Sequence, residues 1–240
     1  ENVILDAEGV PDFDDGSITE NTRGSYPIDF IVNRVASSMA GHAHNVVFLT
    51  CDAFGVLPPI ARLNPTQAAY HFISGYTAKV AGTEIGVKEP KATFSACFGA
   101  PFMPMHPSVY GDLLTEKIDD HGATCWMLNT GWIAGGYGKS DRIRIRWTRA
   151  LLNAALDGSL NNVEMRIDPR FGFEIPVNCE GVPSEILDVR NTWKKPEEYD
   201  EAAENLVNLF KENFECYEED ATASVMAAGP QSMVEQPDDS

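Results

Sequence analysis

The first candidates for chemistry in this sequence are arginines gathered in one short stretch. Arg142, Arg144 and Arg146 alternate with Ile143 and Ile145. A period of two predicts a strand that carries three guanidinium groups on one face. Guanidinium groups bind phosphates and carboxylates in a bidentate way, so this face is a candidate anion site. The alternative is a solvated strand face paired with nearby acidic residues.

The segment just before these arginines ends like a phosphate-binding loop, since residues 135–140 read Gly-Gly-Tyr-Gly-Lys-Ser. That motif requires a further glycine at the position of Ile133 and a helix directly after the Ser. The expected strand over 142–147 follows instead. We therefore interpret the segment as a glycine-rich loop that leads into a strand, and we place Lys139 outside any phosphate-binding loop.

Two other groups of residues carry weaker signals. Arg23 lies in an Asn-Thr-Arg-Gly segment before an apolar stretch, where a single arginine is usually an ordinary surface residue. His42 and His44 would share one face of a strand as a chelating pair, but no third ligand is near in the sequence. We therefore assign no metal ligand in this chain.

Charge limits the classes of partner. The chain of 240 residues has a formal net charge of −18, which argues against nucleic acid, because a phosphate backbone requires facing Lys and Arg. Acidic residues concentrate in 197–220 and 235–239, whereas 142–149 is locally basic, a distribution compatible with a small anionic ligand held at one place. No apolar run is long enough to span a membrane, so we expect no membrane partner.

The cysteines predict a reducing compartment. They form no Cys-x-x-Cys pair, so neither a zinc knuckle nor a disulfide framework is indicated. Most have apolar neighbours, which is typical of small buried side chains in a cytoplasmic protein. The five residues are Cys51, Cys97, Cys125, Cys179 and Cys216.

The elements that must position the arginines alternate between strands and helices, which predicts a mixed α/β fold. A hairpin is expected in residues 1–20 with a turn at Asp15 and Gly16, and an extended stretch over 26–32. The continuously apolar run at 45–50 is typical of a strand buried on both faces. Further strands are expected over 124–128 and 142–147, and helices over 66–80, 107–120, 148–157 and 197–214.

The two ends of the chain have their own signals. Glu1 replaces the usual Met and is followed closely by an apolar run, so we expect the chain to be cut from a longer polypeptide. Periodicity is lost after Asp220. We expect one nucleotide- and substrate-binding domain over residues 1–220, partial at its N-terminal side, and a frayed tail over 221–240.

Several segments, in one order from residue 1 to about 230, together carry a family resemblance. They include Phe-Asp-Asp-Gly-Ser at 13–17, Asn-Thr-Arg at 21–23, Ser-Tyr-Pro-Ile at 25–28, Thr-Cys-Asp-Ala-Phe-Gly-Val-Leu-Pro-Pro at 50–59, Tyr-His-Phe-Ile-Ser-Gly-Tyr-Thr-Ala-Lys at 70–79, Phe-Ser-Ala-Cys-Phe-Gly-Ala at 94–100, Asn-Thr-Gly-Trp at 129–132 and Ala-Ala-Gly-Pro at 227–230. The sequence resembles the C-terminal portion of the ATP-dependent phosphoenolpyruvate carboxykinases.

The resemblance implies a fold and a function. The fold is the mixed-sheet C-terminal nucleotide-binding domain of that family, with its sheet completed by residues upstream of this chain. Such enzymes convert oxaloacetate and ATP to phosphoenolpyruvate, carbon dioxide and ADP in gluconeogenesis, with magnesium and manganese. Their phosphate-binding loop, catalytic lysine and metal ligands also lie upstream, so this chain alone is expected to be inactive. The alternatives are a non-catalytic nucleotide-binding subunit or pseudoenzyme of the same fold, and a different kinase with a related scaffold.

The resemblance also implies roles for four residues. Arg23 matches the family arginine that contacts the substrate and the transferring phosphoryl group, so it is the expected catalytic and substrate-binding residue. Arg142 and Ile143 match the pair that lines the nucleotide pocket, and Thr148 matches a threonine close to the adenine. Residues 134–141 form a longer loop than in some family members, which leaves Arg144 as the alternative to Arg142.

Overall fold

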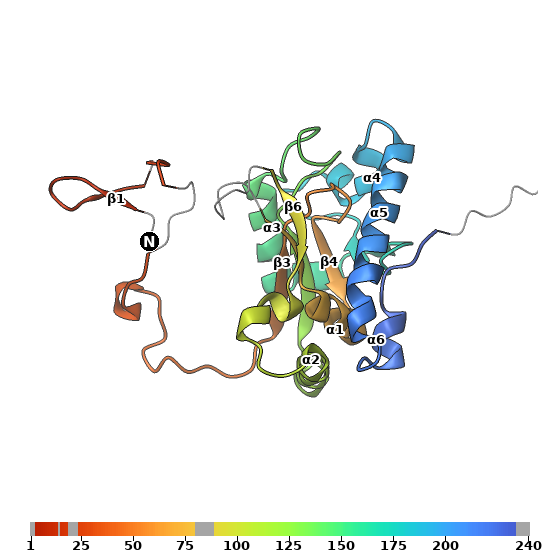
Figure 1. Cartoon of the computed structure of the whole chain (residues 1–240), viewed down its shortest axis with the longest axis horizontal. Coiled ribbons are helices and arrows are strands. Elements are labelled where there is room, and N and C mark those ends of the chain that lie inside the picture. Colours follow the sequence, from red (N-terminus) through yellow and green to blue (C-terminus); the bar gives the residue numbers. More distant parts are fainter. Residues whose placement is uncertain (1–2, 14, 19–23, 80–88, 234–240) are drawn as a thin grey trace, which may run out of the picture. The chain divides into compact units, whose positions relative to one another are not determined.

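The computed structural model describes residues 3–13, 15–18, 24–79 and 89–233. The chain divides into two units by its contacts, Glu1–Ala43 with Lys79–Lys91, and His44–Ala78 with Ala92–Ser240. The second unit carries the central sheet and most of the helices (Figure 1). The sequence-based boundary at residue 220 stays a prediction.

The first unit contains a short hairpin. Strands β1 (Ile4–Leu5) and β2 (Pro11–Asp12) pair antiparallel. The turn lies between them, where the Asp6 carboxylate accepts the amides of Glu8 and Val10. The turn predicted at Asp15 and Gly16 lies after this hairpin, and there the Ser17 amide donates to the Asp15 carboxylate at 2.8 Å. Residues 14 and 19–23 lie outside the described residues, so strand pairing across that turn stays a prediction.

The stretch expected to be extended over 26–32 contains a single turn of 3-10 helix, η1 (Ile28–Phe30). Pro27 precedes it with a φ of −59°, and the Ile31 amide donates to the Ile28 carbonyl. Local hydrogen bonds thus replace the strand pairing that the apolar composition suggested. Arg23 lies outside the described residues.

The second unit is built on a mixed sheet of five strands in the order β3-β7-β4-β9-β8 (Figure 1). The mixed α/β fold is confirmed, because β3 and β7 run parallel whereas the pairs β4–β7, β4–β9 and β8–β9 are antiparallel. The strands are β3 (Asn45–Thr50), β4 (Ile60–Leu63), β7 (Thr124–Asn129), β8 (Met165–Ile167) and β9 (Glu174–Pro176).

The burial expected for the 45–50 strand is only partly correct. Phe48 and Thr50 are buried, but Leu49 is 61% exposed. β3 stands at the end of the strand order and pairs only with β7 in the sheet described here. Leu49 lies on the face opposite to Phe48 and Thr50, so that face of β3 is only partly covered at this edge of the sheet.

Helix α1 (Pro65–Ser74) is shorter than expected. It starts at a capping box between Asn64 and Gln67, and it ends at Gly75, which has a φ of 57°. A Cβ at Gly75 would lie 1.7 Å from the Ser95 carbonyl oxygen, so the residue must be glycine. The predicted helix end near residue 80 was wrong, because Gly75 turns the chain into strand β5 (Tyr76–Lys79), which pairs with β6 (Lys91–Phe94).

Two expected helices are confirmed. Helix α2 (Pro107–His121) ends at Gly122 with a left-handed backbone, and helix α5 (Pro196–Phe214) runs over the predicted range. The remaining elements are α3 (Ile145–Leu156), α4 (Val189–Thr192) and the 3-10 turns η2 (Ala96–Phe98), η3 (Ala100–Phe102), η4 (Ser159–Asn162), η5 (Ser184–Leu187) and η6 (Glu215–Tyr217).

The stretch expected to fray after Asp220 contains helix α6 (Ala223–Ala227). The Thr222 hydroxyl accepts the Val225 amide at the start of the helix, and the Val225 side chain is buried. Further on, the Gln231 amide donates to the Arg170 carbonyl at 2.7 Å. These contacts order a segment whose weak periodicity had suggested a tail.

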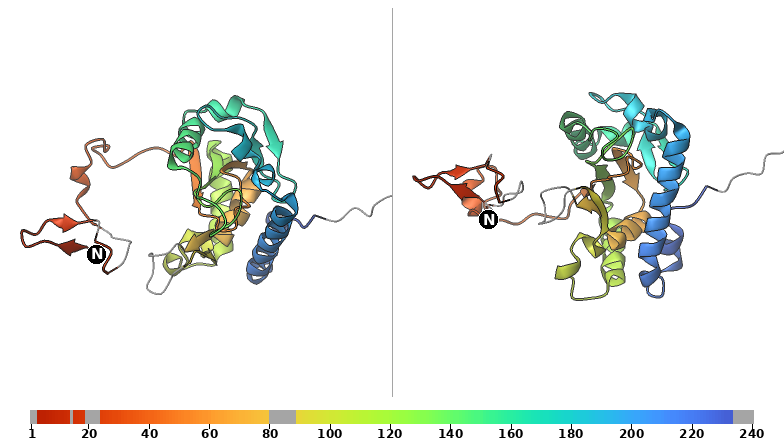
Figure 2. Two further views of the ribbon diagram at one scale, coloured as in Figure 1. Left: turned by 90° about the horizontal axis from the view of Figure 1, so that it is seen from above. Right: turned by 45° about the horizontal axis from the view of Figure 1, so that its top comes forward.

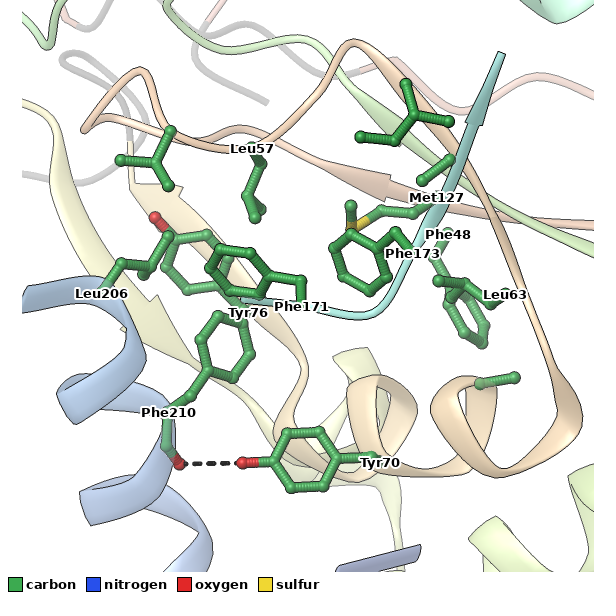
Figure 3. Packing of buried hydrophobic residues seen from close by; sticks show 14 of the residues in the cluster. Phe48, Leu57, Leu63, Tyr70, Tyr76, Met127, Phe171, Phe173, Leu206 and Phe210 are labelled. Atoms are coloured by element: carbon green, nitrogen blue, oxygen red, sulfur yellow. Dashed lines mark hydrogen bonds between the residues drawn. The ribbon is translucent and has the colours of Figure 1, made fainter. Parts of the chain in front are cut away.

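Alternate residues of β7 divide the core between the two faces of the sheet. Cys125 and Met127 belong to the larger cluster, which α1 and α5 cover, and Trp126 and Leu128 belong to the smaller one, which α3 covers. Figure 2 shows α3 and α5 on opposite sides of the sheet. Figure 3 shows the larger cluster, where the Tyr70 hydroxyl donates to the Phe210 carbonyl at 3.4 Å.

Within the larger cluster, His71 is buried with an uncharged ring. Its ring centroid lies 4.9 Å from that of Phe173 and 5.1 Å from that of Phe210. Its Nε2 atom has no hydrogen-bond partner among the described residues. Burial lowers the pKa of His71 to about 3, because the aromatic surroundings penalise the charged form.

None of the helices in the described ranges is long and apolar enough to cross a membrane.

Because folded His71 resists protonation, the stability of the chain should fall on mild acidification. Between about pH 7 and about pH 5, unfolded His71 takes up a proton that the folded residue, with a pKa of about 3, does not, so about 2 kcal/mol of unfolding free energy is lost. Urea unfolding at both pH values measures this loss. His71→Phe should remove that part of it, whereas the matched change of the exposed His121→Phe should not. An equal loss in wild type and His71→Phe contradicts the prediction.

Candidate active site

The candidate site lies where the parallel strands β3 and β7 end. Thr50 pairs with Asn129 at the last position of both strands, so the segments that follow them leave the sheet side by side. Ligands of open α/β sheets bind outside the carboxyl ends of such strands. Residues 51–57 follow β3, and residues 130–144 follow β7.

The Asp52 carboxylate holds the segment after β3. It is fully buried and accepts the amides of Phe54, Val56 and Leu57 at 2.9, 2.7 and 2.8 Å. The Tyr76 hydroxyl from β5 donates to the same carboxylate at 2.8 Å. Burial raises the pKa of Asp52, and these hydrogen bonds oppose the shift. The turn 52–57 is thereby fixed by one side chain.

The Asn129 side chain joins this turn to the segment after β7. Its Oδ1 accepts the amides of Asp52 at 3.0 Å and Gly131 at 2.8 Å, and its Nδ2 donates to the Leu57 carbonyl at 2.9 Å. The Trp132 amide in turn donates to the Asp52 carbonyl at 2.9 Å. Both segments therefore form one hydrogen-bonded body.

Glycines allow these segments to approach each other. A Cβ at Gly131 would lie 2.2 Å from the Asp52 carbonyl oxygen, and one at Gly55 would lie 2.1 Å from the Gly135 carbonyl oxygen. Both contacts are with backbone atoms, which cannot rotate away. A side chain at either position would force the two segments apart.

Arg142 docks on this body with its charge unpaired. Its Nε donates to the Thr130 carbonyl at 2.9 Å, its Nη2 lies 3.4 Å from the Thr130 hydroxyl, and its Cζ lies 5.6 Å from the centroid of the Trp132 ring. Among the residues that the structure describes, no carboxylate lies within ion-pair distance of Arg142. The guanidinium is exposed, so its remaining donors can bind an anion.

Ile143 and Thr148 follow Arg142 on different elements. The Ile143 amide donates to the Gly131 carbonyl at 2.8 Å, and its side chain is 6% exposed. Thr148 lies in the second turn of α3 and is half-buried. Tertiary pairing thus joins Arg142 and Ile143 to the carboxyl end of β7, and α3 places Thr148 after them. The Arg142 guanidinium donates to Thr130 and not to Thr148 in the described part of the chain, and a shared pocket for the three residues stays a prediction.

The predicted strand over 142–147 was wrong. Only one isolated bridge, between Arg142 and Trp132, is formed, and α3 begins at Ile145 rather than at residue 148. The helix buries Leu151 and Ala155 in the smaller core cluster. Ile145, which a strand would have buried on the same face as Ile143, is instead 65% exposed. Burial at helical spacing therefore outweighs the local alternation.

The three arginines accordingly do not share one strand face. Arg144 precedes the first residue of α3 and Arg146 lies in its first turn, with Cζ atoms 5.1 and 5.4 Å from the Trp147 ring. The described residues offer neither of them a carboxylate at ion-pair distance, so the alternative of pairing with acidic neighbours finds no support here. Arg144 remains the alternative to Arg142.

The glycine-rich segment does not form a phosphate cradle. The amides of Tyr137, Lys139 and Ser140 donate to the carbonyls of Ala53 and Gly136, and the Ser140 hydroxyl donates to the Gly135 carbonyl. The helix that follows starts only at Ile145. Our argument that a strand follows was wrong, but the conclusion is supported by different observations, because those amides have partners already.

Sequence reasoning found one signal for this region and missed the residues that support the site. The junction at residues 51–55 was recognisable as the end of a buried strand, but nothing in its local pattern showed that Asp52 would meet Asn129 and Tyr76. Cys51 is buried beside Arg142, and burial raises its pKa, so it stays a neutral thiol. The described part of the chain contains no cluster of three or more His, Cys, Asp or Glu that could hold a metal ion.

Fold and site together define an α/β protein with an exposed arginine, Arg142, beside the carboxyl ends of two parallel strands. A family model described as phosphoenolpyruvate carboxykinase matches residues 1–185. The chain is 61% identical to the phosphoenolpyruvate carboxykinase (ATP) of Mesorhizobium japonicum, and 60% identical to those of Rhizobium rhizogenes and Brucella suis, each over 96% of the chain. The chain belongs to the phosphoenolpyruvate carboxykinase family. It spans 43% of the length of these relatives.

The close approach at Gly131 can be tested by adding one methyl group. Gly131→Ala should lower the unfolding free energy by roughly 1–3 kcal/mol, because its Cβ would overlap the Asp52 backbone. Urea unfolding followed by tryptophan fluorescence measures the change. Gly41→Ala is the matched control, since a Cβ there meets nothing within 4 Å. Equal stability of the two variants would show that the segments are not held together as described.

Proposed function

We propose that this chain is the C-terminal part of an ATP-dependent phosphoenolpyruvate carboxykinase, which converts oxaloacetate and ATP to phosphoenolpyruvate, carbon dioxide and ADP. The observation that carries the proposal is the identity of about 60% over 96% of the chain with enzymes of that name. The unpaired guanidinium of Arg142 at the strand ends supports it, because an anionic nucleotide requires such a group. A role in gluconeogenesis follows from the same reaction.

Arg142, Ile143 and Thr148 are proposed as one side of the ATP pocket. Arg142 would meet a negatively charged or polar part of the nucleotide with donors that Thr130 and Trp132 leave free. The buried Ile143 would give the pocket its apolar wall, and the Thr148 hydroxyl would bind close to the adenine. All three residues lie within seven positions of one another, between the end of β7 and the second turn of α3.

Arg23 is proposed as the catalytic and substrate-binding residue. Loss of carbon dioxide from oxaloacetate leaves an enolate, which must approach a phosphoryl group of the same sign of charge. A planar guanidinium that contacts both partners stabilises the charge that develops between them. Magnesium and manganese ions, when bound, would offset the same repulsion. We assign their ligands to residues upstream of this chain.

The proposed partners are the two substrate pairs, oxaloacetate with phosphoenolpyruvate and ATP with ADP, and the N-terminal part of the same enzyme. The chain spans 43% of the length of its relatives, which supports the proposal that the complete enzyme also contains an N-terminal part. We also propose a cytoplasmic location, supported by four buried free cysteines among the described residues: Cys51, Cys97, Cys125 and Cys179.

The chain alone should not turn over. Assays of the pure chain with oxaloacetate, ATP, magnesium and manganese should give no phosphoenolpyruvate, whereas the chain joined to the N-terminal part of a close relative should give it. Formation of phosphoenolpyruvate by the chain alone would contradict the prediction. Nucleotide binding without turnover by the joined enzyme would favour a non-catalytic nucleotide-binding protein instead.

Arg23 and Arg142 should have separable effects in the joined enzyme. Arg23→Ala should lower kcat by two to four orders of magnitude, roughly 3–5 kcal/mol, with little change in ATP affinity, and Arg23→Lys should recover only part of the loss.

Arg142→Met should instead weaken ATP binding. Arg34→Ala is the matched control, because Arg34 pairs with Asp29.

Steady-state kinetics with each substrate varied distinguishes the cases. An Arg23→Ala variant with normal kcat and a raised KM for oxaloacetate would show a role in ground-state binding only. An Arg23→Ala variant with normal kcat and normal KM for oxaloacetate would show that Arg23 is an ordinary surface residue.

A further inference from the structure

The segment after β7 folds back on itself and has an inner and an outer face. Trp132 and Arg142 form an antiparallel bridge, so they lie opposite each other on the same face. Ile133 and Ile143, the next residues on the two sides of this bridge, are buried in the larger core cluster. Because neighbouring residues point to opposite faces, Trp132 and Arg142 belong to the outer face.

The Trp132 indole on this outer face supports two exposed groups. The Arg142 Cζ atom lies 5.6 Å from the centroid of the indole ring, and the Tyr137 ring meets it edge to face, with centroids 5.5 Å apart and planes at 89°. Trp132 itself is only 7% exposed, whereas Tyr137 is 45% exposed. An exposed aromatic ring and the guanidinium of Arg142, whose charge is unpaired among the described residues, therefore rest on one indole.

The backbone around Tyr137 is held in place. The Tyr137 amide donates to the Ala53 carbonyl at 2.9 Å, and the Lys139 amide donates to the Gly136 carbonyl at 3.1 Å. A Cβ at Gly136 would lie 2.9 Å from the Ala53 carbonyl oxygen, so the loop approaches the turn after β3 more closely than a side chain would allow. These contacts limit the positions of the Tyr137 ring before any ligand binds, which lowers the entropic cost of binding.

The ligand that fits this outer face is both planar and anionic. An aromatic ring stacks on the flat face of a heterocyclic base, and a guanidinium binds a phosphate. The exposed charged residues of this loop are Lys139 and Arg142 against Asp141, which favours an anion. A nucleotide combines a planar base with negative charge, whereas oxaloacetate offers the charge alone.

We propose that the Tyr137 ring is the surface on which the base of the nucleotide stacks, while Arg142 meets a charged or polar part of the same nucleotide. This inference rests on the proposed carboxykinase function and adds a binding residue to the ATP pocket. Stacking on an aromatic ring tolerates different bases, so Tyr137 contributes affinity, and selectivity for adenine is left to hydrogen-bonding groups such as Thr148.

ADP and tripolyphosphate are the two probes for the joined enzyme, because only ADP carries a base. Isothermal titration calorimetry measures the Kd of each. Tyr137→Ser should raise the Kd for ADP about tenfold and leave that for tripolyphosphate unchanged. Tyr137→Phe keeps the ring and should bind ADP like the wild type. In turnover, Tyr137→Ser should raise the KM for ATP and leave kcat unchanged.

Phe102→Ser is the matched control, because Phe102 is an aromatic residue of η3 that is 85% exposed. This variant should bind both probes normally. An unchanged Kd for ADP in Tyr137→Ser overturns the inference, and so does an equal loss of affinity for ADP and tripolyphosphate. If the wild type forms phosphoenolpyruvate, either result overturns the role of Tyr137 alone. A joined wild type that binds no ADP overturns the proposed function as well.

A measurement on the wild-type side chain covers the case in which Tyr137→Ser does not fold, which near-ultraviolet circular dichroism reveals. With fluorotyrosine in the joined enzyme, the fluorine NMR signal of Tyr137 is identified by its loss in Tyr137→Phe. ADP should shift this signal through the ring current of the base, and tripolyphosphate should leave it in place. No shift with ADP, or equal shifts with both probes, overturns the inference.

Discussion

Asp52 is a fully buried carboxylate that accepts hydrogen bonds from Phe54, Val56, Leu57 and Tyr76. An isolated buried charge is strongly unfavourable, so the loss of any one of these donors destabilises the site. Its backbone adds two further bonds, one from the Trp132 amide and one to the Asn129 side chain. Strands β3, β5 and β7 are thus tied at one residue.

This network joins the candidate site to the core. Val56 and Leu57 turn their side chains into the larger hydrophobic cluster while their amides hold Asp52. The Trp193 indole nitrogen donates to the Gly55 carbonyl at 3.1 Å and connects the region before α5 to the same turn. Packing of the aromatic core and placement of Arg142 are therefore parts of one cooperative structure, in which neither can change without the other.

The chain uses its arginines in two different ways, and the difference is physical. Arg190 is neutralised by a carboxylate in bidentate geometry, which is typical of a structural pair. Arg142 rests on a carbonyl, a hydroxyl and an indole ring, which orient the guanidinium but leave its charge. An arginine held in place by uncharged groups keeps its positive charge, which is what the proposed role of Arg142 in nucleotide binding requires. No local pattern in the sequence distinguishes the two kinds.

The sequence by itself determined the elements whose signals are local: the apolar run of β3, the ends of α2 at Pro107 and Gly122, the absence of a complete phosphate-loop motif, and the family. Tertiary structure decided the rest. Whether residues 145–147 become strand or helix depends on the burial of Leu151 and Ala155, and the end of α1 at Gly75 depends on the Ser95 carbonyl. The bonds of Asp52 with Asn129 and Tyr76 join positions far apart in the chain, and only the folded sheet, which brings the ends of β3 and β7 together, can form them.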